Sequence, residues 1–305
     1  MKMKFEFQDI LGGDILENES RLKRVVEGIN EKKALYQAKP EDFIGLPGYS
    51  EDEVRRELSR TQEQEKQWSG SRTDHERRQK MISDALEGVM VDQFSSDWFA
   101  GQGEGFFTSK PDDYLRGIDA VVEFTNEQTD KKDHVGFALD IAHVSSYGIL
   151  EHKLNSAWKE VASGNLSEVK YFEDSDENKT SLKLSRVVVN VDKETVRDLI
   201  DLYSKKKKEE LAKHKFQYNL ILQVKMQLEA QYKFVSTYAD IQDPTNRYNI
   251  ATKEIGFALK YINDIYELKK DEIEKHRKEI EADPGFRQIK EFYEERAPDS
   301  RVLAA

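Results

Sequence analysis

Two aspartates that lie inside apolar runs are the clearest candidates for chemistry in this sequence. Asp119 belongs to the run 118–124, and Asp140 lies in the middle of the run 135–144. A carboxylate is rarely buried unless it is paired, hydrogen-bonded or bound to a metal. Two carboxylates on neighbouring strands, with Cβ atoms roughly 5 Å apart, would favour a divalent cation. Without a cation, one of the two should have a raised pKa.

The apolar runs themselves predict how these carboxylates are positioned. In 135–144 both alternating faces are apolar, which is typical of a central strand covered on both sides. The polar segment 126–134 predicts a turn, so the two runs should form a hairpin. For a shared metal site, the Asp119 and Asp140 carboxylates must point to the same face of that hairpin.

Helices and further strands surround the predicted hairpin. Apolar residues at helical spacing predict a helix over 75–94, which carries Asp84, Glu87 and Asp92 and could add one carboxylate to the site. A second helix is predicted over 148–162, and strands over 169–172 and 186–191. This order predicts an α/β (α+β) core.

The order of these elements and two short motifs carry a resemblance to a known family. A helix precedes Gly117-Ile118-Asp119, Asp140-Ile141-Ala142 lies on the next strand, and a helix and a strand follow. Over about 80–190 the chain thereby resembles the PD-(D/E)XK nuclease-like superfamily. The resemblance implies a restriction-endonuclease-like fold and phosphodiester hydrolysis by a Mg²⁺- or Mn²⁺-bound water. It implies Asp119 and Asp140 as catalytic metal ligands, with Glu87 as a third.

One position departs from the family pattern. The family's lysine would fall at residue 142, where this chain has Ala142. In some members the lysine comes from the following helix, and Lys153 in 148–162 is the candidate for that role.

Four regions are expected along the chain: an α-helical N-terminal arm (1–70), the nuclease-like core (71–192), a long C-terminal α-helical hairpin (193–282) and a polar tail (283–305). The hairpin is predicted from two periodic stretches, 193–237 and 246–282, separated by Asp243-Pro244.

Composition limits the possible functions. The chain has 305 residues, 48 Lys and Arg against 59 Asp and Glu, and a net charge of −11, so a nucleic-acid contact needs a local basic patch. Lys205 to Lys208 is a basic run, either a solvated face or a phosphate contact. The absence of cysteine excludes disulfides and thiolate zinc sites and suits a cytoplasmic protein. No apolar stretch is long enough for a membrane span.

Two functions therefore remain open. The first is a metal-dependent nuclease that acts on or binds nucleic acid. The second is a catalytically inactive nuclease-like fold that serves as a scaffold, with a protein partner or a second copy bound through helices 193–282. Leu259, Tyr266, Ile273 and Ile280 recur every seven residues there, and such an apolar stripe must be buried somewhere.

Overall fold

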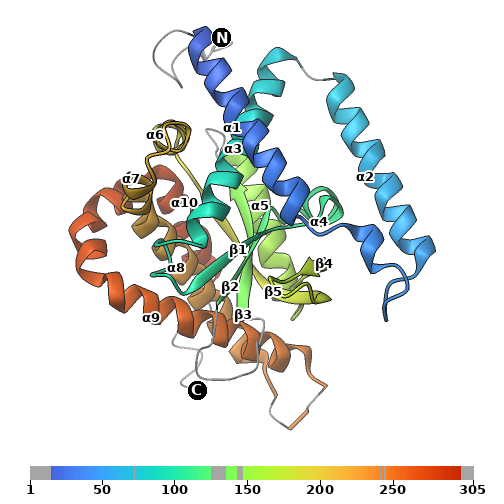
Figure 1. Ribbon diagram of the computed structural model, residues 1–305. Coiled ribbons are helices and arrows are strands. Elements are labelled where there is room, and N and C mark those ends of the chain that lie inside the picture. The colour runs from blue at the N-terminus through green and yellow to red at the C-terminus, as the bar shows by residue number, and fades with distance from the viewer. Residues whose placement is uncertain are drawn as a thin grey trace, which may run out of the picture.

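The computed structural model describes residues 15–71, 73–124, 135–142, 147–240, 242–243 and 245–296. It is a mixed α/β protein in which one sheet is surrounded by helices (Figure 1). The elements in chain order are α1 (Ile15–Tyr36), η2 (Pro40–Phe43), α2 (Glu51–Ser71), α3 (Asp74–Phe94), β1 (Gly103–Phe107), α4 (Lys110–Arg116), β2 (Ala120–Phe124), β3 (Val135–Ala142), α5 (Tyr147–Ala162), β4 (Ser167–Glu173), β5 (Lys179–Asn190), α6 (Lys193–Ser204), α7 (Lys208–Ala212), α8 (Phe216–Tyr238), α9 (Arg247–Ala282) and α10 (Pro284–Arg296).

The sheet has five strands in the order β1-β2-β3-β5-β4. β2 and β3 pair antiparallel, as the sequence predicts, with Ala120 opposite Leu139. β3 and β5 are parallel, and β4 pairs antiparallel with the first part of β5. β1 was not expected, because its sequence contains two glycines and little apolar alternation. A Cβ at Gly105 would lie 2.6 Å from the Val91 carbonyl oxygen, so the glycine lets β1 approach α3.

Helices cover both faces of the sheet (Figure 1). On one face, Phe137, Leu139 and Val187 pack in a core shared with α3, α8 and α9. On the other face, Ala142 and Val188 pack against α5 and α10. Since successive side chains of a strand point to opposite faces, Asp140 lies on the α5 side together with Ala142.

A row of glutamines on α8 takes the place of a strand beside the second half of β5. Gln227 accepts from the Val188 N–H (2.9 Å) and donates to the Val188 carbonyl (2.7 Å). Gln223 does the same with Asn190, at 2.9 and 3.0 Å. Four helical residues rise about 6.0 Å and two strand residues about 6.6 Å, so the two spacings match closely. Side-chain amides thereby satisfy backbone groups that β4 is too short to reach.

Asp112 on α4 satisfies the irregular part of the outer strand β4. The pairing of β4 with β5 shifts between Val169 and Phe172. There the Asp112 carboxylate accepts from the N–H groups of Lys170 (2.9 Å) and Tyr171 (3.0 Å). A β-sheet edge with free backbone groups is a site for unwanted strand pairing, and this contact covers it.

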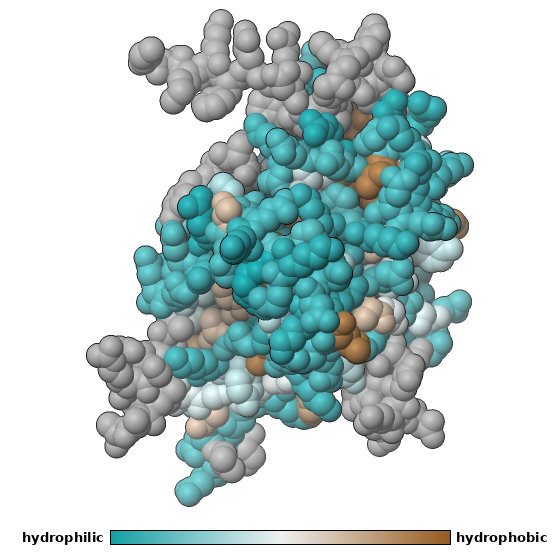
Figure 2. Space-filling model, turned by 90° about the vertical axis from the view of Figure 1, so that its left-hand side faces the viewer, coloured by the Kyte–Doolittle hydropathy of each residue, from teal (hydrophilic) through white to brown (hydrophobic). Residues whose placement is uncertain are grey.

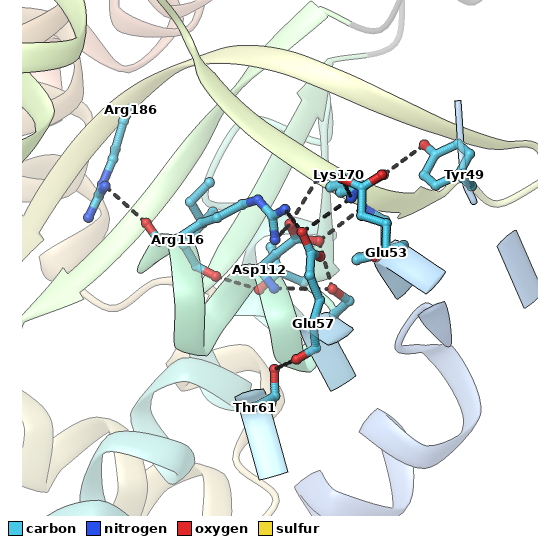
Figure 3. Close-up of polar contacts among 12 residues, drawn as sticks. Tyr49, Glu53, Glu57, Thr61, Asp112, Arg116, Lys170 and Arg186 are labelled. Carbon is cyan, nitrogen blue, oxygen red and sulfur yellow. Dashed lines mark hydrogen bonds and ion pairs between the residues drawn. The ribbon is translucent and has the colours of Figure 1, made fainter. Parts of the chain in front are cut away.

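The N-terminal helices are attached to the core by both apolar and charged contacts. Leu22 and Ile29 of α1 are buried in the main core. Glu57 of α2 pairs with Arg116 (2.8 Å) and with Lys170 (3.2 Å), as Figure 3 shows. The described part of the predicted N-terminal arm, 15–70, is therefore packed against the sheet and its helices.

Two other expectations differ from the structure. The single long helix predicted over 193–237 is divided into α6, α7 and α8. The left-handed backbone of Lys206, with φ of 57°, ends α6, and a second break at 213–215 separates α7 from α8. The expected polar tail contains α10, whose Phe286, Ile289 and Tyr293 are buried. Their spacing of three and four residues is helical, but charged residues between them hide it.

The apolar stripe of α9 is used inside the molecule. Of the predicted seven-residue stripe, Ile273 and Ile280 are buried in the main core, and Leu259 and Tyr266 pack against that core while partly buried. The neighbouring Ile255 and Ile262 are fully buried, and α9 packs largely against α8. Figure 2 shows the face along which α6, α7 and α9 run, and it is mostly hydrophilic with small separate apolar spots. Among the described helices, none combines the length and the apolar character needed to cross a membrane.

Candidate functional site

Asp119 and Asp140 lie close together at the β2–β3 hairpin, where the charges of Lys153 and Asp140 both influence the pKa of Asp119. The Asp119 N–H donates to the Leu139 carbonyl (2.8 Å), although Leu139 pairs with Ala120 in the ladder. Asp119 therefore precedes β2 at a point where the regular pairing ends. The Asp119 Oδ2 accepts from the Ile141 N–H at 2.6 Å.

Gly117 explains why Asp119 directly follows a helix. It caps α4 in the left-handed conformation, with φ of 67°. A Cβ at this position would lie 3.0 Å from the Arg186 guanidinium. Glycine is thus favoured by both its backbone conformation and its neighbour, and the chain turns directly into β2.

Lys153 reaches Asp140 from α5, the helix that covers this face of the sheet. Its ammonium forms an ion pair with Asp140 Oδ1 and donates to the Ile141 carbonyl at 3.3 Å. Burial opposes the charged form, but the neighbouring Asp140 and Asp119 carboxylates outweigh it and raise the pKa of Lys153. The lysine is charged at neutral pH and contacts two oxygen atoms of β3.

Arg186 is a member of the site that the sequence analysis did not identify. It lies on β5, and its Nη2 donates to Asp140 Oδ2 at 2.6 Å, while its Nη1 donates to the Arg116 carbonyl at 3.2 Å (Figure 3). Both oxygens of Asp140 are therefore bonded to cations. Arg186 lies within an apolar strand, which was a signal of the same kind as Asp119 and Asp140.

Glu87 of α3 is held by a different partner. Its Oε1 pairs with Lys33 of α1 at 2.7 Å. Its negative charge still contributes, behind burial and nearer charges, to the pKa of Asp119. Within the part of the chain that the structure describes, no three His, Asp or Glu side chains converge as a metal-binding group.

A further carboxylate with a raised pKa lies on α4, near Glu87, Lys80 and Lys33. Burial, followed by the nearby Glu87, raises the pKa of Asp113 on α4 to about 7. Burial also raises the pKa of Asp119 well above its usual value, and Lys153 opposes that shift. The expectation that one carboxylate of the pair has a raised pKa in the absence of a cation agrees with this result.

The oxygen atoms at the hairpin already bond to protein groups. Asp119, Asp140 and the Ile141 carbonyl offer oxygen donors, and Mg²⁺ in proteins is commonly held by one or two carboxylates with water and substrate phosphate. The Lys153 ammonium is already bonded to two of these three groups, which shows that the site accepts a positive charge. A metal ion would therefore compete with Lys153 for the same oxygens.

Comparisons with protein-family models, with curated proteins and with solved structures find no match to this chain.

Proposed function

We propose that the chain is a metal-dependent phosphodiesterase with a nuclease-like core, acting on nucleic acid. The observation that carries the proposal is the convergence of Asp119, Asp140 and Lys153 at one hairpin, where Asp119 accepts from the Ile141 N–H and Lys153 pairs with Asp140. These residues come from three separate parts of the chain, and chance does not favour their meeting at one buried place.

Asp119 and Asp140 would hold Mg²⁺ or Mn²⁺ together with the Ile141 carbonyl, and Glu87 could join only after leaving Lys33. The bound ion would supply an activated water and offset negative charge on the phosphate. Arg186 keeps the Asp140 carboxylate in a fixed orientation through its 2.6 Å hydrogen bond. Lys153 keeps a positive charge beside the two carboxylates, where a phosphate would otherwise be repelled.

The alternative, a catalytically inactive scaffold, loses the sequence observation that suggested it. The seven-residue stripe of α9 packs mainly within the chain, so it is not left for a partner. What remains in favour of a partner surface is a set of exposed large apolar side chains on the two helices, namely Tyr232, Tyr238, Ile250, Phe257 and Leu268.

The proposal is tested by cleavage of labelled single- and double-stranded DNA and RNA, with Mg²⁺, Mn²⁺ or chelator. We expect metal-dependent cleavage that falls by at least about 100-fold in Asp119→Asn and in Asp140→Asn, since each loses a charged metal ligand. Asp271→Asn, which makes the same change at an exposed position of α9, is the control and should cleave normally. Absence of cleavage on every substrate by the folded native protein, or full activity of Asp140→Asn, would overturn it.

A further inference from the structure

A cavity of about 1040 Å³ lies between α1, the C-terminal end of α3 and the α6–α7 connection. Its lining contains six Lys and Arg side chains and three Asp and Glu side chains. Basic residues therefore outnumber acidic ones in the cavity, whereas the whole chain has a net charge of −11. One of the three acids, Asp92, is already paired with Lys32 and accepts from the Tyr203 hydroxyl at 2.8 Å. The cavity is therefore a local basic region on an acidic protein.

The basic run Lys205 to Lys208 is divided by the fold into two pairs. Lys205 pairs with Asp201 at 2.6 Å, Lys207 pairs with Glu210, and neither lines the cavity. Lys206 and Lys208 line the cavity, and neither forms an ion pair with an acid that the structure describes. Lys213 and Arg24 also line the cavity, and they too form no ion pair with an acid that the structure describes. The unneutralised charges of this run thus face the cavity.

The left-handed backbone conformation of Lys206 is unusual for lysine, which points to a role for its side chain at the cavity. The Lys207 N–H bonds to the Leu202 carbonyl (3.0 Å) and the Lys206 N–H to the Tyr203 carbonyl (2.9 Å). This is the helix ending in which the left-handed position is usually glycine. Lysine with φ of 57° at this position is less favourable than glycine. Such local strain is more common at functional sites than elsewhere.

Gly28 is a second residue that lines the cavity although its type is unfavourable for its local structure. It lies in the interior of α1, where glycine is less favourable than alanine. It lines the cavity, and a Cβ built on it would meet no atom within 4 Å. The missing side chain therefore keeps space open rather than relieving a clash.

We propose that this cavity binds the phosphate backbone of a single-stranded nucleic acid. Four unneutralised cations, contributed by α1, by the α6–α7 connection and by the end of α7, are spread over several elements, which suits successive phosphates better than a single anion. The inference rests on the proposed function for its choice of ligand, since a nuclease must hold its substrate away from the cleaved bond. The same α1 and α3 that line the cavity also carry Lys33 and Glu87 near the carboxylate site.

The test measures binding of a short fluorescein-labelled single strand of DNA or RNA by anisotropy, with chelator present so that no cleavage occurs. We expect Lys206→Gln/Lys208→Gln to weaken binding at least about 10-fold at low salt, and to lower the slope of log K against log salt by about 1.4, or 0.7 for each lost contact. Lys205→Gln/Lys207→Gln changes the same charge in the same run and should bind like the native protein.

A second pair of variants tests the space rather than the charge. Gly28→Leu should block the cavity and weaken binding by a similar factor, while Gly28→Ala should bind normally and make α1 slightly more stable. Equal losses in the two lysine double variants, normal binding by Lys206→Gln/Lys208→Gln, or tighter binding of free ATP than of the oligonucleotide would each overturn the proposal.

The two proposals can fail separately. Loss of binding in Lys206→Gln/Lys208→Gln without any cleavage by the native protein would support the cavity and reject the nuclease. Cleavage by the native protein with unchanged binding by that variant would reject the cavity and leave the nuclease.

Discussion

At the scale of single residues, the position of Lys153 is the most informative feature of the site. A lysine that bonds to Asp140 and to the Ile141 carbonyl occupies the place at which the carboxylates would hold a metal ion. The same side chain then has two opposed effects. It neutralises the carboxylates when no metal is bound, and it must move before a metal can bind.

Replacing Lys153 by methionine should separate metal binding from turnover. Lys153→Met keeps the side-chain length and removes the competing positive charge, so we expect Mn²⁺ to bind at least about 10-fold more tightly by titration calorimetry. Cleavage should fall, because the charge beside the phosphate is lost. Lys159→Met, on the exposed face of the same helix, should leave the affinity for Mn²⁺ unchanged. Equal Mn²⁺ affinities of Lys153→Met and the native protein would contradict this account of Lys153.

The residues of the site differ in how far the sequence could identify them. Asp119 and Asp140 stand out because a carboxylate in an apolar strand needs a partner, and a hairpin fixes their register. Arg186 gives the same signal, but its partner lies in a strand 46 residues earlier, and nothing local links the two. Asp113 follows the buried Asp112 on a short helix, so its raised pKa depends on packing that only the assembled fold provides.

At the scale of elements, the β2–β3 hairpin and α3, α5 and α9 agree with the sequence predictions, because each has strong periodicity. β1 and α4 were not predicted, since glycines and a short length leave no periodic pattern. The order β5-β4 at one side of the sheet could not be predicted either, because both strands are equally apolar. The role of the α8 glutamines is hidden for another reason. Polar residues on a helix usually indicate its solvated face.

The α8 glutamines lead to a prediction about stability. Gln227→Met keeps the shape of the side chain but leaves the Val188 N–H and carbonyl without partners in a buried place. Each such group costs about 1–3 kcal/mol, so we expect a loss of about 2–4 kcal/mol in the free energy of unfolding by urea denaturation. Gln62→Met makes the same change on the exposed face of α2 and should stay within about 0.5 kcal/mol of the native protein. A loss in Gln227→Met no larger than that of this control would mean that the row does not support β5.

At the scale of the whole molecule, charge is distributed unevenly. Acidic groups are in excess over the chain, yet basic side chains gather at the α1–α6–α7 cavity and around the buried carboxylates. Several of those carboxylates have raised pKa values because burial disfavours their charge, among them Asp112, Asp113 and Asp119. The stability of the molecule should therefore depend on pH in an unusual direction.

The expected direction follows from proton binding in the two states. Asp113 has a pKa of about 7 in the folded protein and an ordinary value of 3.8. Between these values the folded state keeps a proton that the unfolded state has lost, so the free energy of unfolding decreases as pH rises from about 4 to 7, and it is level above that range. The slope is at most about 1.4 kcal/mol per pH unit for one group. Lys33, Lys80 and Lys153 face the same cluster, but their raised pKa values affect stability only in strongly alkaline solution.

Urea denaturation between pH 5 and 8 tests this with Asp113→Asn, which removes the titrating group without changing the shape of the side chain. The difference in the free energy of unfolding between Asp113→Asn and Asp271→Asn isolates the contribution of Asp113, because the other titrating residues contribute equally to both variants. One of these is His214, whose burial lowers its pKa and gives the opposite pH dependence at low pH. Relative to the control, we expect Asp113→Asn to lose stability at pH 5, where native Asp113 keeps its proton, and to gain stability at pH 8, where the substitution removes an unfavourable buried charge. As pH rises, the free energy of unfolding of Asp113→Asn should fall less steeply than that of the control. Parallel curves would show that Asp113 is ionised alike in the folded and unfolded states, and that Lys33 and Lys80 compensate fully for its burial.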